Sequence, residues 1–514
     1  MKNHIVYTAL LPLAGLYACG GGETETKPNV LFVIADDQSY PYAGAYGCRT
    51  VSTPGFDRVA RQGVLFTNAY VTSPGSSPSR ASILTGLYPW QIEEAGTHAS
   101  SFPDEYTCFP DMLREAGYRI GYTGKGWGPG DWQVSGRPYN PAGPEYNECR
   151  LNPPYSGISK IDYAANFKKF LSGRDKGEPF CFWLGTHEPH RPFENGSWVK
   201  EKRELDRAEV PGFLPGSDTV RGDISDYAVE IEWFDRHLAA CLDELERIGE
   251  LDRTIVIVTA DNGMSFPHAK ANCYDAGLHV PLAVRWGDRI RPGQVVDALV
   301  SMVSVAPTLL DAVGIEYEGD YPLSGESLMP LLSGRRERYG TDAVYAGRER
   351  HSCSRRDNLG YPMRSVRVGN YLLVRNFHSE RWPAGDPRAY DKKGTTLMPM
   401  HRAYYDIDAA PSKDYLIDRR DDPSVRPYFD AAVAKRPEYE LFDLKNDPDC
   451  MHNVAGDMTY ADVLENLRGR LDARLTETGD PRVVGDDPEI WERYPRLSGK
   501  MRLFPEENES VVVK

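Results

Sequence analysis

The stretch NVLFVIADD, residues 29–37, decides the fold class of this chain. Residues 30–35 are all apolar, with no polar alternation, and two aspartates follow them directly. Such a short, continuously apolar run predicts a strand that is buried on both faces, as in a parallel sheet covered by helices. Similar runs occur at residues 118–124, 179–185, 254–260 and 281–286. Together these runs predict an α/β domain.

Helical patterns separate the predicted strands. In the clearest pattern, apolar side chains recur at spacings of three and four between residues 227 and 245, which places them on the core face of one helix. We therefore expect a large mixed, mostly parallel sheet sandwiched by helices over residues 28–335.

The pattern changes after about residue 334, where buried runs become fewer and half-polar strands such as YLLVRN, residues 371–376, appear. This change predicts a smaller C-terminal α+β domain at residues 336–480, with an antiparallel sheet and a helix near residues 460–475. The tail at residues 481–514 is rich in proline and acidic residues, and we expect it to wrap the surface without a core of its own.

Composition limits the possible partners. The chain has 514 residues, of which 40% are hydrophobic and 26% charged, so it is long enough for one large core and a smaller domain. Its formal net charge of -15 argues against a nucleic-acid partner, because binding a polyanion needs a basic surface. An anionic substrate would have to enter a locally positive pocket.

The N-terminus reads as an export signal. Its apolar run, residues 5–16, is too short to span a bilayer, and the motif LYAC at residues 16–19 resembles a bacterial lipoprotein signal. We expect a signal at residues 1–19, a lipid on Cys19 as the sole membrane contact, and a flexible tether at residues 20–27. This predicts a periplasmic or outer-membrane-anchored lipoprotein of a Gram-negative bacterium. The alternative is an ordinary secretory signal cleaved nearby.

Polar side chains follow four of the predicted strands directly. In open α/β sheets, ligands bind outside the carboxyl ends of the strands, so these residues are expected to meet at one edge. Any one of them could be a helix cap or a turn residue, but four strand ends together favour a site. Three carboxylates and an amide form an all-oxygen set that suits calcium or magnesium. The candidate ligands are Asp36, Asp37, Asp261 and Asn262.

The stretch SPGSSPSRASILTG, residues 73–86, reads as a loop that enters a helix N-terminus, which is a ready anion site. The alternative is a serine N-cap beside a solvated Arg80. A divalent cation, several fixed cations and an imidazole together suit a compact multi-oxygen anion, which predicts sulfuryl or phosphoryl transfer. The candidate positive groups and imidazole are Arg80, Lys125, His187 and Lys270.

The motif SSPSR, residues 76–80, followed by LTG, residues 84–86, resembles the signature of type I sulfatases of the alkaline-phosphatase superfamily. The resemblance implies an alkaline-phosphatase-like fold and oxidation of Ser76 to formylglycine by a serine-type formylglycine-generating enzyme. It implies one calcium ion held by Ser76 and the four candidate ligands. It also implies that Arg80 holds the nucleophile, while Lys125, His187 and Lys270 bind sulfate and assist the leaving group.

Three segments, residues 77–87, 261–267 and 361–367, most resemble the heparan N-sulfatase (sulfamidase) branch of that family. The resemblance implies hydrolysis of O- or N-linked sulfate from sulfated glycans, including glycosaminoglycan saccharides such as heparan sulfate.

Further side chains are candidates to contact a sugar. Arg355 and Arg356 could instead be a solvated basic run. Many family members have a histidine where this chain has Trp127 in GKGWG, residues 124–128. An indole cannot accept a proton, so we expect Trp127 to stack on a sugar ring and His190 to stand in as the base. The full candidate set is His98, Trp127, His190, His351, Arg355 and Arg356.

Two other functions remain open from the sequence. The first is a phosphonate or phosphodiester hydrolase, because relatives share the nucleophile and metal arrangement. The second is a non-catalytic sulfoglycan-binding lipoprotein, against which the intact set of site residues argues.

Overall fold

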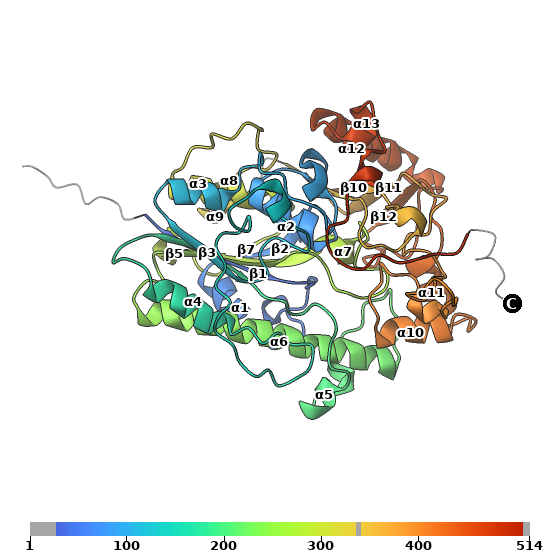
Figure 1. The fold of residues 1–514 in the computed structure, drawn as a ribbon, viewed down its shortest axis with the longest axis horizontal. Coiled ribbons are helices and arrows are strands. Elements are labelled where there is room, and N and C mark those ends of the chain that lie inside the picture. Colours follow the sequence, from blue (N-terminus) through green and yellow to red (C-terminus); the bar gives the residue numbers. More distant parts are fainter. Residues whose placement is uncertain (1–26, 336–340, 507–514) are drawn as a thin grey trace, which may run out of the picture.

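A computed structural model describes residues 27–335 and 341–506. Its centre is an eight-stranded sheet in the order β3-β4-β1-β5-β6-β2-β7, with β8 beside β2 (Figure 1). Among these strands, only β6 pairs antiparallel with its neighbours, so the predicted mixed, mostly parallel sheet is confirmed. The strands are β1 (Asn29–Ala35), β2 (Val64–Tyr70), β3 (Arg119–Gly124), β4 (Phe180–Gly185), β5 (Thr254–Ala260), β6 (His279–Arg285), β7 (Gln294–Val296) and β8 (Val300–Ser301).

Helices cover both faces of this sheet. Figure 1 shows α1, α4 and α6 on one face and α2, α3, α8 and α9 on the other. The long helix α6 supplies Phe234, Leu238 and Leu242 to the main core, in agreement with the periodicity of its sequence. The helices of this domain are α1 (Pro54–Gln62), α2 (Ser76–Thr85), α3 (Phe109–Glu115), α4 (Tyr163–Ser172), α5 (Ser197–Lys200), α6 (Asp218–Arg247), α7 (Asp275–Leu278), α8 (Val305–Val313) and α9 (Met329–Leu332).

The C-terminal domain is built on a four-stranded antiparallel sheet in the order β12-β11-β10-β9. Helix α12 packs on β10 and β11, at the position where the sequence predicts a helix. The strands are β9 (Ala343–Arg348), β10 (Met363–Val368), β11 (Tyr371–Asn376) and β12 (Tyr439–Asp443). The helices are α10 (Pro411–Asp418), α11 (Arg426–Val433), α12 (Ala461–Glu477), α13 (Pro481–Val484) and α14 (Ile490–Arg493).

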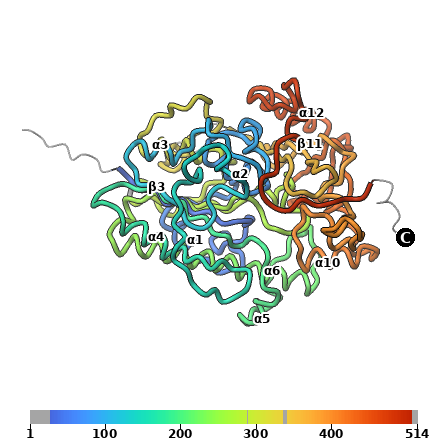
Figure 2. The backbone as a smooth tube through the Cα atoms, in the orientation of Figure 1, coloured from blue at the N-terminus to red at the C-terminus, as the bar shows by residue number. Residues whose placement is uncertain are grey.

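The described part of the tail contributes a side chain to a hydrophobic core and does not only cover the surface. Trp491 is buried in the core of the C-terminal domain together with Leu467 and Leu471. Beyond it, the chain crosses to the N-terminal domain, where the Leu497 amide donates to the Ala99 carbonyl at 2.8 Å. Figure 2 shows this last segment, in dark red, reaching the border of the N-terminal half and then turning back across the C-terminal domain. The tail therefore ties the two domains together.

The predicted signal, and the predicted tether except for Lys27, lie outside the described residues. Within the described residues, no helix has the length and apolarity needed to cross a bilayer. The eight cysteines of the described part are all unpaired.

Candidate active site

Three carboxylates meet at the carboxyl ends of β1 and β5. These strands are neighbours, with Ala35 opposite Ala260, so the residues that follow them leave the sheet side by side. The carboxylate oxygens of Asp36, Asp37 and Asp261 lie within 4.8 Å of one another, and all three residues are buried. The structure thus brings together the acidic residues that the sequence analysis singled out.

Asn262 completes an all-oxygen set. Its Nδ2 donates to Asp37 Oδ1 at 2.7 Å and to the Gly263 carbonyl at 2.9 Å, while its Oδ1 lies 3.5 Å from Ser76 Oγ. Burial raises the pKa of Asp261, and Asp36 adds to this effect against the opposing Arg80. Hard oxygen donors crowded in this way, with repulsion between them, fit a divalent cation.

Ser76 is the first residue of α2, as the loop-to-helix prediction requires. Its Oγ donates to Asp36 Oδ1 at 3.0 Å and accepts from Lys125 Nζ at 2.9 Å. Pro78 lies in the first turn, where its missing N–H costs no helical hydrogen bond. Gly86 ends the helix with a φ of 74°, a left-handed conformation that glycine adopts without strain. Pro78 and Gly86 thus mark the start and the end of the helix whose first residue is Ser76.

Arg80 is fully buried rather than solvated, so the alternative of a serine cap beside a solvated arginine is wrong. Its Nε donates to Asp261 Oδ2 at 2.8 Å, and its Nη1 donates to the carbonyls of Lys125 and Gly126. Its Nη2 has no hydrogen-bond partner among the described residues and lies 3.8 Å from Asp36 Oδ1. This unpaired donor suits an oxygen of a bound anion or of the modified side chain at position 76.

The two aspartates that follow β1 each form an ion pair with a lysine. Lys125 Nζ donates to both oxygens of Asp36, at 2.8 and 2.6 Å. Lys270 Nζ donates to Asp37 Oδ2 at 2.6 Å and to Asp408 Oδ2 at 3.0 Å. Burial alone would raise the pKa of Asp36, but Lys125, followed by His190 and Arg80, outweighs it and holds that pKa well below its ordinary value. The carboxylate stays ionised and available to a cation.

Burial and neighbouring charges also have opposite effects on the pKa of Lys270. Burial alone would lower its pKa, but Asp37 and then Asp408 outweigh burial and raise it. Lys270 therefore remains a fixed positive charge at the side of the site where the two domains meet.

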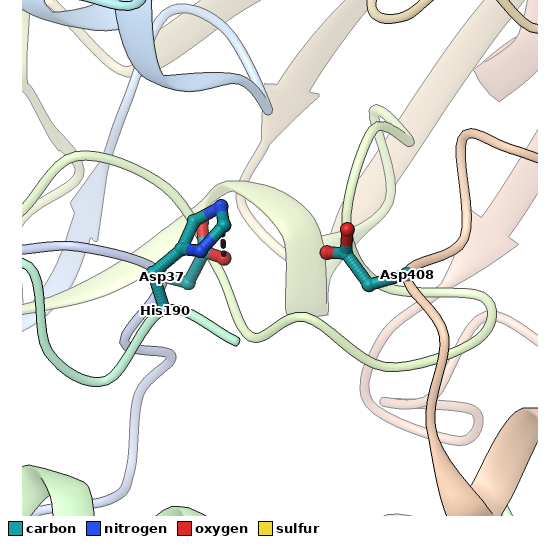
Figure 3. A group of neighbouring side chains, drawn as sticks. All are labelled: Asp37, His190 and Asp408. Atoms are coloured by element: carbon teal, nitrogen blue, oxygen red, sulfur yellow. Dashed lines mark ion pairs between the residues drawn. The ribbon is translucent and has the colours of Figure 1, made fainter. Parts of the chain in front are cut away.

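The outer part of the site carries two histidines and one unexpected aspartate. His187 follows β4 with an exposed side chain, but loss of hydration inside the site, opposed by the negative charge of Asp36, lowers its pKa to about 4. His190 Nε2 lies 3.8 Å from Asp37 Oδ2. Figure 3 shows Asp37 and His190 on one side and Asp408, from the C-terminal domain, on the other. Asp408 was not predicted, because DIDAAP, residues 406–411, has the composition of an ordinary turn.

Trp127 requires a correction. Its side chain is only 3% exposed, packs edge-to-face on Phe102 with ring centres 5.2 Å apart, and donates its indole N–H to the Ser77 carbonyl at 3.0 Å. Asn140 holds its backbone in a pair of hydrogen bonds. Trp127 thus presents no face on which a sugar could stack, and it instead supports the helical turn that carries Ser76.

Two further candidate sugar contacts also lie differently from the expectation. Arg355 is buried and bonded to Asp406 and to the carbonyls of Trp382 and Pro383, so it is neither a sugar contact nor a solvated charge. Arg356 is half-exposed and pairs with Glu506 on the surface. Arg355 is buried because it forms an ion pair with Asp406, and no pattern in the sequence indicates this pair.

His98 and His351 pack on the loop before the nucleophile. Their ring centres are 4.5 Å apart, and a Cβ on Gly75 would lie only 3.0 Å from His351 Nδ1. Burial lowers the pKa of His351 to about 3 and that of His98 well below its ordinary value, so both rings are neutral at pH 7. Both rings lie beside Gly75, the residue before Ser76; His351 is buried and His98 is partly buried.

The fold and this cluster define a sulfatase, and comparison with known proteins agrees. Residues 28–315, more than half of the chain, match the family model described as Sulfatase, so the chain belongs to the sulfatase family. Members of this family generally use a formylglycine and a metal ion. Residues 267–389 match the model described as N-sulphoglucosamine sulphohydrolase, C-terminal. The human N-sulphoglucosamine sulphohydrolase is 30% identical over 506 residues, covering 90% of this chain and 93% of the human protein.

Other relatives support the same assignment. An N-acetylglucosamine-6-O-sulfatase of Bacteroides thetaiotaomicron is 25% identical, over 94% of this chain and 92% of its own length. A solved structure of a protein bound to D-glucosamine-2-N,6-O-disulfate superposes with a TM-score of 0.63 at 21% identity, covering 89% of this chain and 99% of the other. At that identity the superposition shows the fold alone. The predicted resemblance to sulfatases of the sulfamidase branch is confirmed.

Proposed function

We propose that this protein hydrolyses sulfate from sulfated glycans, with N- or O-sulfated glucosamine saccharides of the glycosaminoglycan type as substrates. The observation that carries the proposal is the placement of Ser76 between Asp36 and Lys125, with Arg80 and the other acidic residues around it. The names of the relatives, which include sulfatases of glucosamine derivatives, support the substrate class.

Two groups complete the proposed site. A formylglycine, made from Ser76 by a serine-type generating enzyme, would supply a nucleophilic hydroxyl when hydrated, and a calcium ion held by Asp36, Asp37, Asp261 and Asn262 would supply positive charge. We favour calcium over magnesium because a carboxylate-rich pocket that exchanges substrate tolerates the larger, more flexible calcium shell.

The remaining residues act on the substrate itself. Lys125 and Lys270 place two ammonium groups around the cluster, where they attract a sulfate and stabilise charge that develops on its oxygens. His187 lies beside them and would donate a proton to the leaving oxygen or nitrogen of the sugar once a bound sulfate, by its negative charge, favours the protonated ring. His190, whose Nε2 lies 3.8 Å from Asp37 Oδ2, would accept a proton in place of the family histidine replaced by Trp127.

A substrate panel tests this function. Protein carrying the modification should release sulfate from at least one of the N-, 2-O-, 3-O- and 6-O-sulfated glucosamine saccharides. We expect kcat/KM for that saccharide to exceed that for an aryl phosphate or phosphonate ester by about a hundredfold or more, because the site is matched to one transition-state charge. Faster turnover of the phosphorus esters would support the phosphonate hydrolase. Tight saccharide binding without any sulfate release would support a binding protein.

We also propose that the chain is exported and held at a membrane only by a lipid on Cys19, on the basis of the LYAC motif. Cells that express the full chain should incorporate a labelled fatty acid into it, and Cys19→Ala should remove the label. Label retained in that variant would exclude the proposed anchor.

A further inference from the structure

A cavity of about 520 Å³ lies in the C-terminal domain beside the candidate active site. One part of its lining comes from residues 390–413 and the other from residues 500–503 of the tail. The tail therefore closes a cavity that the C-terminal domain alone leaves incomplete.

Asp408 belongs to both the cavity and the active site. Its carboxylate lines the cavity and also accepts from Lys270 Nζ at 3.0 Å, within the group formed with Asp37 and His190. Figure 3 shows Asp408 facing these two residues. The cavity therefore adjoins the cluster that holds Lys270.

The cavity carries unpaired positive charge. Among the described residues, the side chains of Lys392, Arg402 and Lys500, all lining residues, have no hydrogen-bond or ion-pair partner. The acidic lining residues are already engaged, because Asp391 accepts from the amides of Thr395 and Thr396 and Asp408 accepts from Lys270.

The other two cations of the lining have structural partners. Lys413 Nζ donates to the carbonyls of Ala403, Tyr404 and Ile407, and the Arg502 guanidinium lies 3.8 Å from the centre of the Tyr405 ring. Lys413 and Arg502 thus shape the wall, while the three unpaired cations remain free for a ligand.

We propose that this cavity is a second anion subsite, which binds another sulfate or a carboxylate of the same saccharide whose first sulfate is hydrolysed. The inference rests on the proposed function and deepens it, because it predicts that multiply charged saccharides are the preferred substrates. In a chain with a net charge of -15, free cations gathered at one cavity next to the site are the feature that an anionic sugar can recognise.

Three substrates separate the sources of the second anion: N-sulfoglucosamine, N,6-O-disulfated glucosamine, and an N-sulfated disaccharide that contains a uronate. With modified wild-type protein, we expect higher kcat/KM for at least one multiply charged substrate than for N-sulfoglucosamine. A gain with the disulfated sugar assigns the subsite to sulfate, and a gain with the disaccharide assigns it to carboxylate.

The double variant Arg402→Ala, Lys500→Ala should reduce this preference, measured as the ratio of the two kcat/KM values, by about tenfold, because two partly solvated charge interactions are lost. Lys393→Ala is the matched control, since Lys393 is an exposed neighbour of Lys392 outside the lining, and it should keep the wild-type ratio.

Two results would overturn the inference while leaving the proposed function intact. One is equal kcat/KM for all three substrates in wild type, and the other is an unchanged ratio in the double variant. Release of sulfate from none of the three substrates by modified wild type would instead overturn the proposed function together with the inference.

Discussion

Ser76→Ala is expected to abolish sulfate release, with a loss of about 10⁴-fold or more, under every expression condition. The Ser76 Oγ lies between Asp36 Oδ1 at 3.0 Å and Lys125 Nζ at 2.9 Å, and alanine leaves no atom there to oxidise or to react. Ser76→Cys should restore activity when a cysteine-type generating enzyme is co-expressed in an aerobic host. Wild-type protein from the same host should be inactive, because that enzyme does not act on serine.

Ser73→Ala is the matched control for the loss of a buried serine in the same loop. Ser73 stands outside the SSPSR motif, so this variant should keep both the modification and the activity of wild type produced in an anaerobic host. Sulfate release by Ser76→Ala at a rate near that of wild type would remove Ser76 from the mechanism.

Asp261→Asn is expected to remove both catalysis and the response of the protein to metal. Asp261 accepts from Arg80 Nε through Oδ2 at 2.8 Å and from the Asp37 amide through Oδ1 at 3.0 Å. An asparagine keeps only one acceptor, so one buried donor loses its partner, at a cost of about 1–3 kcal/mol in the free energy of unfolding. Loss of the negative charge also weakens the cation site, and we expect kcat/KM to fall by about 10³-fold or more.

Thermal unfolding with calcium and after chelation measures the metal effect. At a calcium concentration of about a hundred times Kd, binding should stabilise wild type by about 2.7 kcal/mol, and this gain should vanish in Asp261→Asn. Asp235→Asn is the matched control, because Asp235 is a buried carboxylate that accepts from the amides of Gly55 and Phe56 at the start of α1. It should lose stability yet keep the calcium response. Full activity of wild type after exhaustive chelation would contradict the metal site.

Sequence patterns predicted the parts of the site that lie at strand ends. The runs that form β1 and β5 are continuous and apolar, and the parallel sheet brings Asp36 and Asp261 together because Ala35 and Ala260 are paired. Strand β2 was not predicted, since Thr67 and Asn68 interrupt its apolar run. The apolar pattern of a sequence therefore predicts most reliably the strands that are buried along their whole length.

Side chains whose role depends on distant contacts could not be placed from the sequence. Trp127 and Arg355 read as sugar contacts because aromatic and basic residues occur at saccharide sites, but both are buried against partners far along the chain. Asp408 lies 138 residues after Lys270, and only the packing of the two domains brings their side chains together. Such contacts have no signature in a single sequence.

The mass of the tryptic peptide of residues 62–80, measured in a preparation that releases sulfate, tests the central claim most directly. The proposed function predicts the loss of two hydrogens at Ser76 and nowhere else in that peptide, with a modified fraction that rises in proportion to the rate of sulfate release across preparations. An active preparation in which Ser76 is unmodified, or in which another serine carries the change, would contradict it.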